Sequence, residues 1–185
     1  MANFFFSGSV QTKLDEKNRF VLPQAMRYGL IENGQLEFTI ALGLGGCLTI
    51  YRNSEISKIA EKFRKKQHIY KYQRFFTLFF STLHTTTCDK LGRIVLPSML
   101  KKAVGIATNL VVAGVLNKIE IWSEEKYEQE VLRYLSPELD QSLISMTEDA
   151  FALLGDEEPQ ETIIDKSDES QEDGVDVEPY FCNVT

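Results

Sequence analysis

Residues 12–27 read TKLDEKNRFVLPQAMR, and residues 86–101 read TTCDKLGRIVLPSMLK. The two stretches lie 74 residues apart and are identical at six of sixteen positions, namely Thr, Asp, Arg, Val, Leu and Pro in the same order. A second pair follows at nearly the same offset, because residues 47–63 resemble residues 118–134. Self-similarity at one spacing indicates repeated structural units. The sequence therefore predicts a duplicated domain, with a first and a second repeat.

Both repeats are expected to contain the same elements in the same order. Proline suits the first turn of a helix, so the Leu-Pro step marks a helix start in each repeat. Alternating and β-branched runs indicate strands, and serine before a helical run is a usual N-cap. The predicted strands span residues 10–12, 19–22, 35–42, 47–51, 85–88, 93–96, 109–115 and 118–122. The predicted helices run from Pro23 to Gly29, over 55–66 behind Ser54, over 70–81, 97–104 and 124–134, and from Ser136 to Leu153 or Leu154.

The repeated Asp-x-x-x-Arg pattern predicts a tight turn between two short strands. Such a turn needs a residue that tolerates positive φ, and asparagine and glycine are of this type. The aspartate can accept hydrogen bonds from turn amides, while the arginine stands at the turn edge and can reach outward. A single copy would be read as a surface ion pair that fixes the hairpin, but its recurrence before Val-Leu-Pro favours a function. The turn residues are Asp15, Asn18 and Arg19 in the first repeat, and Asp89, Gly92 and Arg93 in the second.

An aromatic segment, residues 70–81 (YKYQRFFTLFFS), lies between the repeats. Its rings could stack on nucleobases, but at helical spacing they are expected in the core or between protomers. We therefore expect a buried helix that joins the two halves. The basic run at 64–66 precedes it and is interpreted as a solvated helix end, where cations favour the helix dipole.

Charge separates the chain into a body and a tail. The net charge is −7, but residues 156–185 contain eleven Asp/Glu and one lysine, a balance of −10, which leaves +3 for residues 1–155. Low hydrophobicity and like charges predict a disordered tail. The tail is either a solvating extension or an acidic segment that competes with a polyanion for the basic body.

Composition argues against several classes of protein. Cys47, Cys88 and Cys182 are scattered, which indicates a reducing compartment. No stretch approaches the roughly 20 apolar residues of a membrane span, and the first residues lack the pattern of a signal peptide. His68 and His84 are the only histidines and have no zinc-like spacing. We expect a cytoplasmic protein with no metal, cofactor, small-molecule substrate or membrane partner, and without a nucleophile and adjacent base we expect no enzymatic activity.

The paired motifs LDEKNRFVLP (14–23) and CDKLGRIVLP (88–97) resemble the MraZ family of bacterial transcriptional regulators, which contain two SpoVT-AbrB domains. The resemblance covers roughly residues 4–150. It implies an α+β, mainly β fold, namely a duplicated swapped-hairpin (AbrB-like) β-barrel with short helices and a pseudo-twofold repeat. The expected boundaries are a first repeat at 4–53, a connecting helical segment at 54–81, a second repeat at 82–125, a C-terminal helical segment at 126–155 and the acidic tail at 156–185.

The resemblance also implies a function, which is sequence-specific binding of short direct repeats in promoter DNA upstream of division and cell-wall genes. It implies a ring-shaped homo-oligomer, an octamer or larger, that is associated with the nucleoid. In that family the Asp-x-x-x-Arg loops face DNA, so the contact is carried over to Arg19 and Arg93. Phosphate neutralisation gives affinity. The further candidate contacts are Lys13, Lys17 and Arg27 near the first loop, and Lys90, Lys101 and Lys102 near the second.

Three features depart from the family pattern. Asn18 stands where the first loop usually has glycine, Thr77 where a basic residue is usual, and the acidic tail is additional. A body at only +3 per protomer is weakly basic, so affinity would depend on avidity. The alternative is therefore kept that the chain is a structural or protein-partner oligomer that does not bind DNA.

Overall fold

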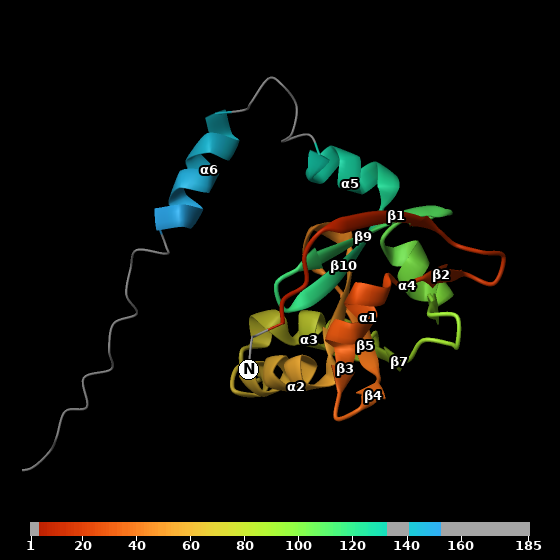
Figure 1. Ribbon diagram of the computed structural model, residues 1–185. Helices are drawn as coiled ribbons and strands as arrows, with labels where there is room; N and C mark the ends of the chain where they lie inside the picture. Colours follow the sequence, from red (N-terminus) through yellow and green to blue (C-terminus); the bar gives the residue numbers. More distant parts are fainter. Residues whose placement is uncertain (1–3, 133–140, 153–185) are drawn as a thin grey trace, which may run out of the picture. The chain divides into compact units, whose positions relative to one another are not determined.

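The computed structural model describes residues 4–132 and 141–152. Short strands and helices alternate along the first of these ranges (Figure 1). The strands are β1 (Ser9–Lys13), β2 (Arg19–Val21), β3 (Ile31–Glu32), β4 (Gln35–Leu36), β5 (Phe38–Leu42), β6 (Leu48–Arg52), β7 (His84–Thr86), β8 (Arg93–Val95), β9 (Asn109–Val115) and β10 (Lys118–Ser123). The helices are α1 (Gln24–Leu30), α2 (Asn53–Arg64), α3 (Gln73–Ser81), α4 (Ser98–Ala103), α5 (Glu124–Glu130) and α6 (Gln141–Ala152), with 3-10 turns η1 (Leu44–Gly46) and η2 (Tyr70–Tyr72).

The main sheet interleaves strands of the two repeats. Its order is β1-β9-β10-β6-β5-β7, with antiparallel pairing throughout. The first strand of each repeat pairs with the other repeat, because β1 lies on β9 and β7 lies on β5. The repeats meet at the central pair β6–β10, where Ile50 lies opposite Ile119. Neither repeat therefore completes its part of the sheet alone.

The two Asp-x-x-x-Arg motifs meet in a second, two-stranded sheet. Strands β2 and β8 pair antiparallel, with Phe20 opposite Ile94. Leu22 donates its backbone N–H to the Gly92 carbonyl at 3.0 Å, and Leu96 donates to the Asn18 carbonyl at 2.8 Å. Each strand thus ends against the turn of the opposite repeat.

One hydrophobic core joins both repeats. Phe20 and Ile94 are 1% and 0% exposed, and Ile50 and Ile119 are both 0% exposed. These residues belong to a single cluster that also includes side chains from α1, β5, α4 and β9. A repeat of about 50 residues buries too little apolar surface for comfortable stability, and sharing a core relieves this shortage.

The predicted fold class is confirmed at the level of an α+β protein, with mostly antiparallel strands and short helices. Among the described residues the strand pairing ends at β1 and β7, so the main sheet is hydrogen-bonded as an open sheet rather than a closed barrel. The same residues include no helix long and apolar enough to cross a membrane.

Some element boundaries differ from those predicted. The expected strand at 35–42 is divided into β4 and β5. Helix α2 begins at Asn53, and Ser54 lies inside it and donates its amide and hydroxyl hydrogens to Glu32 instead of acting as the N-cap. Gly29 lies within the last turn of α1, where an added Cβ would clash with the rings of Phe4 and Phe6. The expected helix start at Ser136, and the tail, lie outside the described residues.

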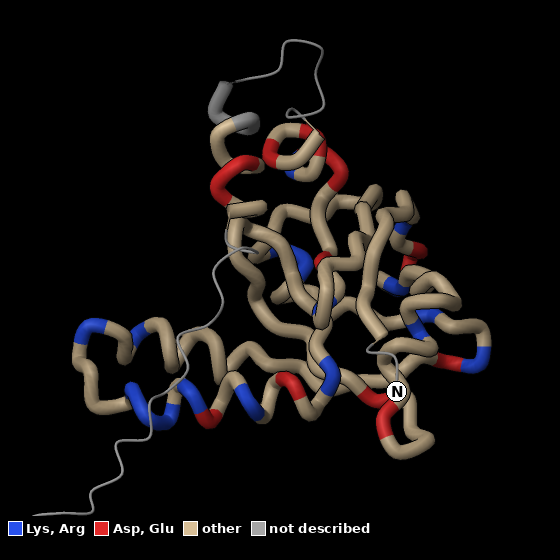
Figure 2. The backbone as a smooth tube through the Cα atoms, turned by 60° about the vertical axis from the view of Figure 1, so that its left-hand side comes forward, with Lys and Arg blue, Asp and Glu red and all other residues tan. Residues whose placement is uncertain are grey.

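The helix predicted over residues 70–81 forms, but the prediction that it is buried is wrong. Residues 70–81 form η2 and α3, in which only Phe79 is buried. Helix α3 folds back on α2, and its rings gather around Phe63 at centroid distances of 5.4–6.1 Å. The α2–α3 hairpin projects from the body instead of filling its centre (Figure 2), so most of its aromatic side chains remain exposed.

Candidate nucleic-acid interface

The first loop is organised by the Asp15 carboxylate. Its Oδ1 accepts hydrogen bonds from the backbone N–H groups of Lys17 and Arg19, each at 2.9 Å. Its Oδ2 accepts from Arg19 Nε at 2.7 Å and lies 2.7 Å from Nη2 of the same guanidinium. Asn18 has φ 54°, the left-handed conformation that asparagine tolerates. The aspartate therefore fixes both the turn and the arginine that follows it.

The second loop repeats the aspartate's hydrogen bonds to two backbone amides and to the arginine Nε. Asp89 Oδ1 accepts from the N–H groups of Leu91 and Arg93 at 2.9 Å, and Oδ2 accepts from Arg93 Nε at 2.7 Å. Gly92 occupies the left-handed position, with φ 75°. Asp15, Asn18, Asp89 and Gly92, the residues singled out from the sequence as turn-forming, lie in these two turns.

Electrostatics keep both loops in their charged form. The side-chain hydrogen bond from Arg19 lowers the pKa of Asp15 to about 2, helped by backbone hydrogen bonds from Arg19 and Lys17. The backbone hydrogen bond from Arg93 is the largest of the contacts that lower the pKa of Asp89. Both pairs are partly exposed, so they add little to global stability. Their effect is local, because they orient two guanidinium groups.

The outer face of the β2–β8 ribbon carries two arginines and two valines. Arg19 lies opposite Val95, and Arg93 lies opposite Val21. With a rise of about 3.3 Å per residue and a strand spacing of about 4.8 Å, the two arginine Cα atoms lie about 8 Å apart on the diagonal. Val21 and Val95 are 49% and 52% exposed. Two apolar side chains therefore lie exposed beside the two arginines.

The other predicted contacts fall into two groups. Lys13, at the end of β1, is exposed, as are Lys17 and Lys90 in the two turns. Arg27 differs, because it is half-buried against the Gly92 backbone and its Nε is buried without a hydrogen-bond partner among the described residues. Lys101, which occupies the equivalent position in the second repeat, donates from Nζ to Asn18 Oδ1 at 2.9 Å.

These crosswise contacts were missed by sequence reasoning, which placed Arg27 and Lys101 beside the loop of their own repeat. The available signal was that both cations stand eight residues after the motif arginine. Nothing in one repeat, however, indicates that β2 pairs with β8.

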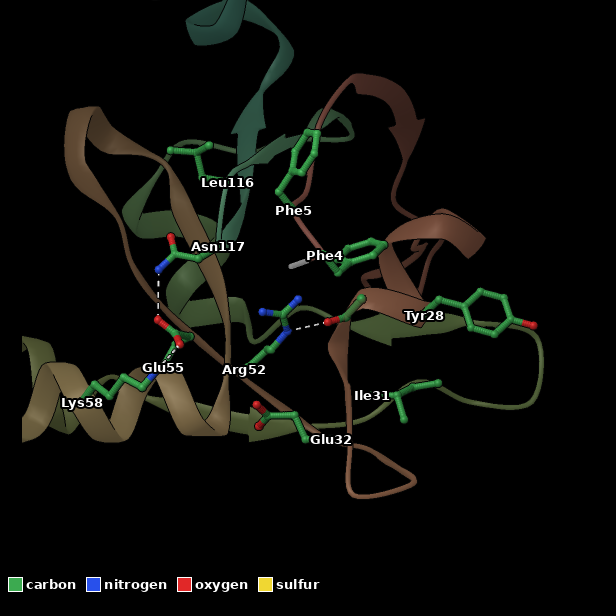
Figure 3. Close-up of a pocket in the computed structure, with 11 residues that line it drawn as sticks. Phe4, Phe5, Tyr28, Ile31, Glu32, Arg52, Glu55, Lys58, Leu116 and Asn117 are labelled. Atoms are coloured by element: carbon green, nitrogen blue, oxygen red, sulfur yellow. Dashed lines mark hydrogen bonds and ion pairs between the residues drawn. The ribbon is translucent and has the colours of Figure 1, made fainter. Parts of the chain in front are cut away.

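A second candidate site is a hollow at the N-terminal end of the body (Figure 3), lined by residues of α1, α2 and the N-terminal segment. Its Arg52 lies over the rings of Phe4 and Phe6, with centroid distances of 5.9 and 5.0 Å, and donates from Nε to the Gly29 carbonyl. Glu55 contacts Lys58 at 2.7 Å and accepts from the Asn117 side chain at 3.0 Å. The polar side chains of Arg52 and Glu55 thus already have hydrogen-bond or ion-pair partners within the protein, which indicates a structural role for them. The described residues contain no cluster of three or more metal-ligating side chains.

Comparison with known proteins identifies the family of this chain. The model of the MraZ protein family matches twice, at residues 5–78 and 79–150. The chain is 38% identical over 125 residues to the transcriptional regulator MraZ of Clostridium beijerinckii, covering 67% of this chain and 85% of the relative. It is 36% identical over 141 residues to the same regulator of Clostridium botulinum strain Eklund 17B, covering 76% and 94%.

A regulator from a third organism gives a similar result. The transcriptional regulator MraZ of Mesomycoplasma hyopneumoniae (strain 7448) is 36% identical over 133 residues, with 71% of this chain and 88% of the relative covered. The two family matches together span most of the chain, and each contains one copy of the Asp-x-x-x-Arg motif. The chain belongs to the MraZ family.

Proposed function

We propose that this protein is a sequence-specific DNA-binding transcriptional regulator and not an enzyme. It binds short direct repeats in promoter DNA, upstream of division and cell-wall genes, through the paired loops of a ring-shaped homo-oligomer. Its relatives carry the name transcriptional regulator MraZ. The observation that carries the proposal is the pair of aspartate-clamped arginines on the outer face of one β-ribbon.

The clamp leaves each arginine suited to reading a base. A guanidinium has five N–H donors; in Arg19, Asp15 engages one on Nε and one on Nη2, so three remain toward its other edge. A bidentate contact to guanine O6 and N7 uses such an edge. The major groove admits a two-stranded ribbon, and a separation of about 8 Å between Arg19 and Arg93 corresponds to about two base-pair steps.

The neighbouring side chains supply the other contacts of such an interface. The exposed ammonium groups of Lys13, Lys17 and Lys90 are placed to neutralise phosphates, which gives affinity without sequence information. The exposed methyl groups of Val21 and Val95 can contact thymine methyl groups between the two arginines. Arginine, lysine and valine would then serve base reading, phosphate binding and apolar contact respectively.

A ring explains how a weakly basic protomer could bind well. Several loop pairs bound to successive DNA repeats raise the effective concentration of each further contact.

The α2–α3 hairpin offers an assembly surface, because Tyr72, Phe75 and Leu78 are 44%, 41% and 55% exposed. Large exposed apolar patches mark interaction sites. Residues 62–74 carry six cations and no carboxylate, whereas α5 carries four glutamates and one lysine. Contact between two such different surfaces is head-to-tail and can close a ring. We further propose that assembly completes the swapped-hairpin barrel and follows the repeat boundaries expected from the sequence.

The alternative is an oligomeric module that binds a protein partner and not DNA. The exposed aromatic hairpin and the net charge of −7 favour it. The retained pair of clamped arginines argues against it, since a purely structural ribbon has no need of two outward guanidinium groups.

An electrophoretic shift assay with the DNA upstream of the protein's own gene distinguishes the two functions. Wild-type protein should give a saturable, repeat-dependent shift that weakens with salt, while Arg19→Ala and Arg93→Ala should lose it. Lys58→Ala is the matched control, because it removes an exposed cation on α2 that is paired with Glu55. No shift of the wild type at low salt, or an unchanged shift with both arginine variants, would support the alternative.

A further inference from the structure

A cation from each repeat contacts the DNA-facing loop of the other repeat. In the first loop, Asn18 holds a left-handed conformation and its side-chain Oδ1 accepts a hydrogen bond from Lys101 Nζ at 2.9 Å. Lys101 belongs to α4 of the second repeat. The loop that carries Arg19 is thus supported by a side chain 83 residues along the chain.

The second loop has the mirrored arrangement with different chemistry. Arg27, in the last turn of α1, lies against Gly92, so that a Cβ added there would be 2.5 Å from both Cζ and Nη1 of the guanidinium. Gly92 is buried and has φ +75°, so the missing side chain both permits the turn and makes room for Arg27. The Nε of Arg27 is buried and has no hydrogen-bond partner among the described residues, so the observed link to this loop is the close packing of the guanidinium against Gly92 and not a hydrogen bond from Nε.

The backbone couples the loops in the same crosswise sense. Asn18 and Gly92 accept the hydrogen bonds that end the β2–β8 ladder, from the N–H groups of Leu96 and Leu22. Asn18 and Gly92 therefore each contact the other repeat twice. The backbone carbonyl accepts a hydrogen bond from it, and a cation of that repeat, Lys101 or Arg27, lies against the turn residue. The two loops are thus joined at the ends of one ribbon.

We infer that Arg27 and Lys101 are positioning residues, each of which sets the loop of the opposite repeat, so that the two arginines are presented to DNA as one preorganised unit. The inference rests on the proposed DNA-binding function. It reassigns Arg27 and Lys101 from the candidate phosphate contacts to the support of the reading loops. Preorganisation of this kind raises affinity by reducing the cost of ordering on binding.

The salt dependence of binding separates support from phosphate contact. Each phosphate contact that is lost lowers the slope of log affinity against log salt concentration by about one. Arg27→Met and Lys101→Met in the full-length protein should weaken operator binding about threefold or more and leave this slope unchanged. Lys17→Ala and Lys90→Ala are the matched controls and should lower the slope. A reduced slope in Arg27→Met and Lys101→Met would overturn the inference.

The same variants can be examined without DNA by amide NMR. Lys101→Met should shift the amide resonances of residues 16–19, and Arg27→Met those of residues 90–93, each in the opposite repeat. Asn18→Gly keeps the left-handed turn but removes the acceptor, so it should reproduce Lys101→Met, and the combination should add nothing further. Shifts confined to each variant's own repeat would contradict the crosswise support even if DNA binding itself failed.

A double-mutant cycle on operator binding completes the test. Arg27→Met should be non-additive with Arg93→Ala, whose loop it supports, and closer to additive with Arg19→Ala. Lys101→Met should show the reverse preference. Equal coupling to both arginines, in variants that match the wild type in melting temperature and oligomer mass, would overturn the inference while leaving the proposed function intact.

Discussion

Replacing Ile50 by alanine is expected to destabilise both repeats together, although Ile50 belongs to the first. The side chain is fully buried in β6, where its sheet partners Ile40 and Ile119 are also fully buried. Truncation leaves a cavity that such a site cannot readily collapse, and Ile→Ala changes in cores cost about 2–5 kcal/mol. We expect about 3–4 kcal/mol, a large fraction of the roughly 5–15 kcal/mol that stabilises a typical domain. At this chain size the loss corresponds to a fall of roughly 6–16 °C in the melting temperature.

Trp122 makes this cooperativity measurable, because it is the only tryptophan and lies in β10 of the second repeat. Urea unfolding at fixed protein concentration should be followed by far-ultraviolet circular dichroism and by Trp122 fluorescence. Both signals should shift to the same lower midpoint in Ile50→Ala. Ile31→Ala, at a side chain that is 43% exposed, is the matched control and should change stability by about 0.5 kcal/mol or less. A biphasic circular dichroism curve with an unmoved fluorescence midpoint would show that the repeats fold independently and would refute the reasoning.

Three further predictions concern the loops, the hairpin and the tail. The pKa of Asp15 is lowered from 3.8 to about 2. The stabilisation of the loop by the ionised carboxylate should therefore be complete above about pH 4 and lost as the pH falls through about 2. A carboxyl ¹³C titration of Asp15 with a midpoint near pH 4 would contradict this. Leu78→Glu on the exposed face of α3 should reduce the mass of the oligomer measured by light scattering without changing the circular dichroism spectrum, and an unchanged mass would exclude this face from the assembly. Removing residues 156–185, a segment at −10, should strengthen operator binding at low salt and have less effect where the Debye length is about 8 Å; equal affinities of the full-length and truncated proteins would make the tail a solvating extension.

Local features were predictable from the sequence because they depend on local chemistry. The positive φ of Asn18 and Gly92 follows from the demands of a tight turn, and β9 has the bounds of the strand predicted over residues 109–115. The roles of Asp15 and Asp89 in their turns could also be predicted, because an aspartate near a turn bonds to amides only a few residues away. Repetition of the motif added the information that both loops have the same role.

Long-range features could not be predicted in this way. The pairing of β1 with β9 and of β7 with β5 depends on which half completes the sheet, and no residue pattern within one repeat specifies it. The exposure of α3 was missed because an aromatic helix suits a core and an assembly surface equally well. Placing Lys101 beside Asn18 required the crosswise ribbon to be known first.

The most direct test of paired-loop reading is the specificity ratio of an Arg19→Lys/Arg93→Lys double variant. Lysine keeps the charge but loses the rigid fork that binds guanine in two places. Competition anisotropy with the operator and with a scrambled duplex, at one salt concentration, gives the ratio of specific to non-specific affinity. We predict that the affinity for scrambled DNA stays close to that of the wild type while the operator preference falls to near one. Retention of the wild-type operator preference by the double variant would contradict reading by these two arginines.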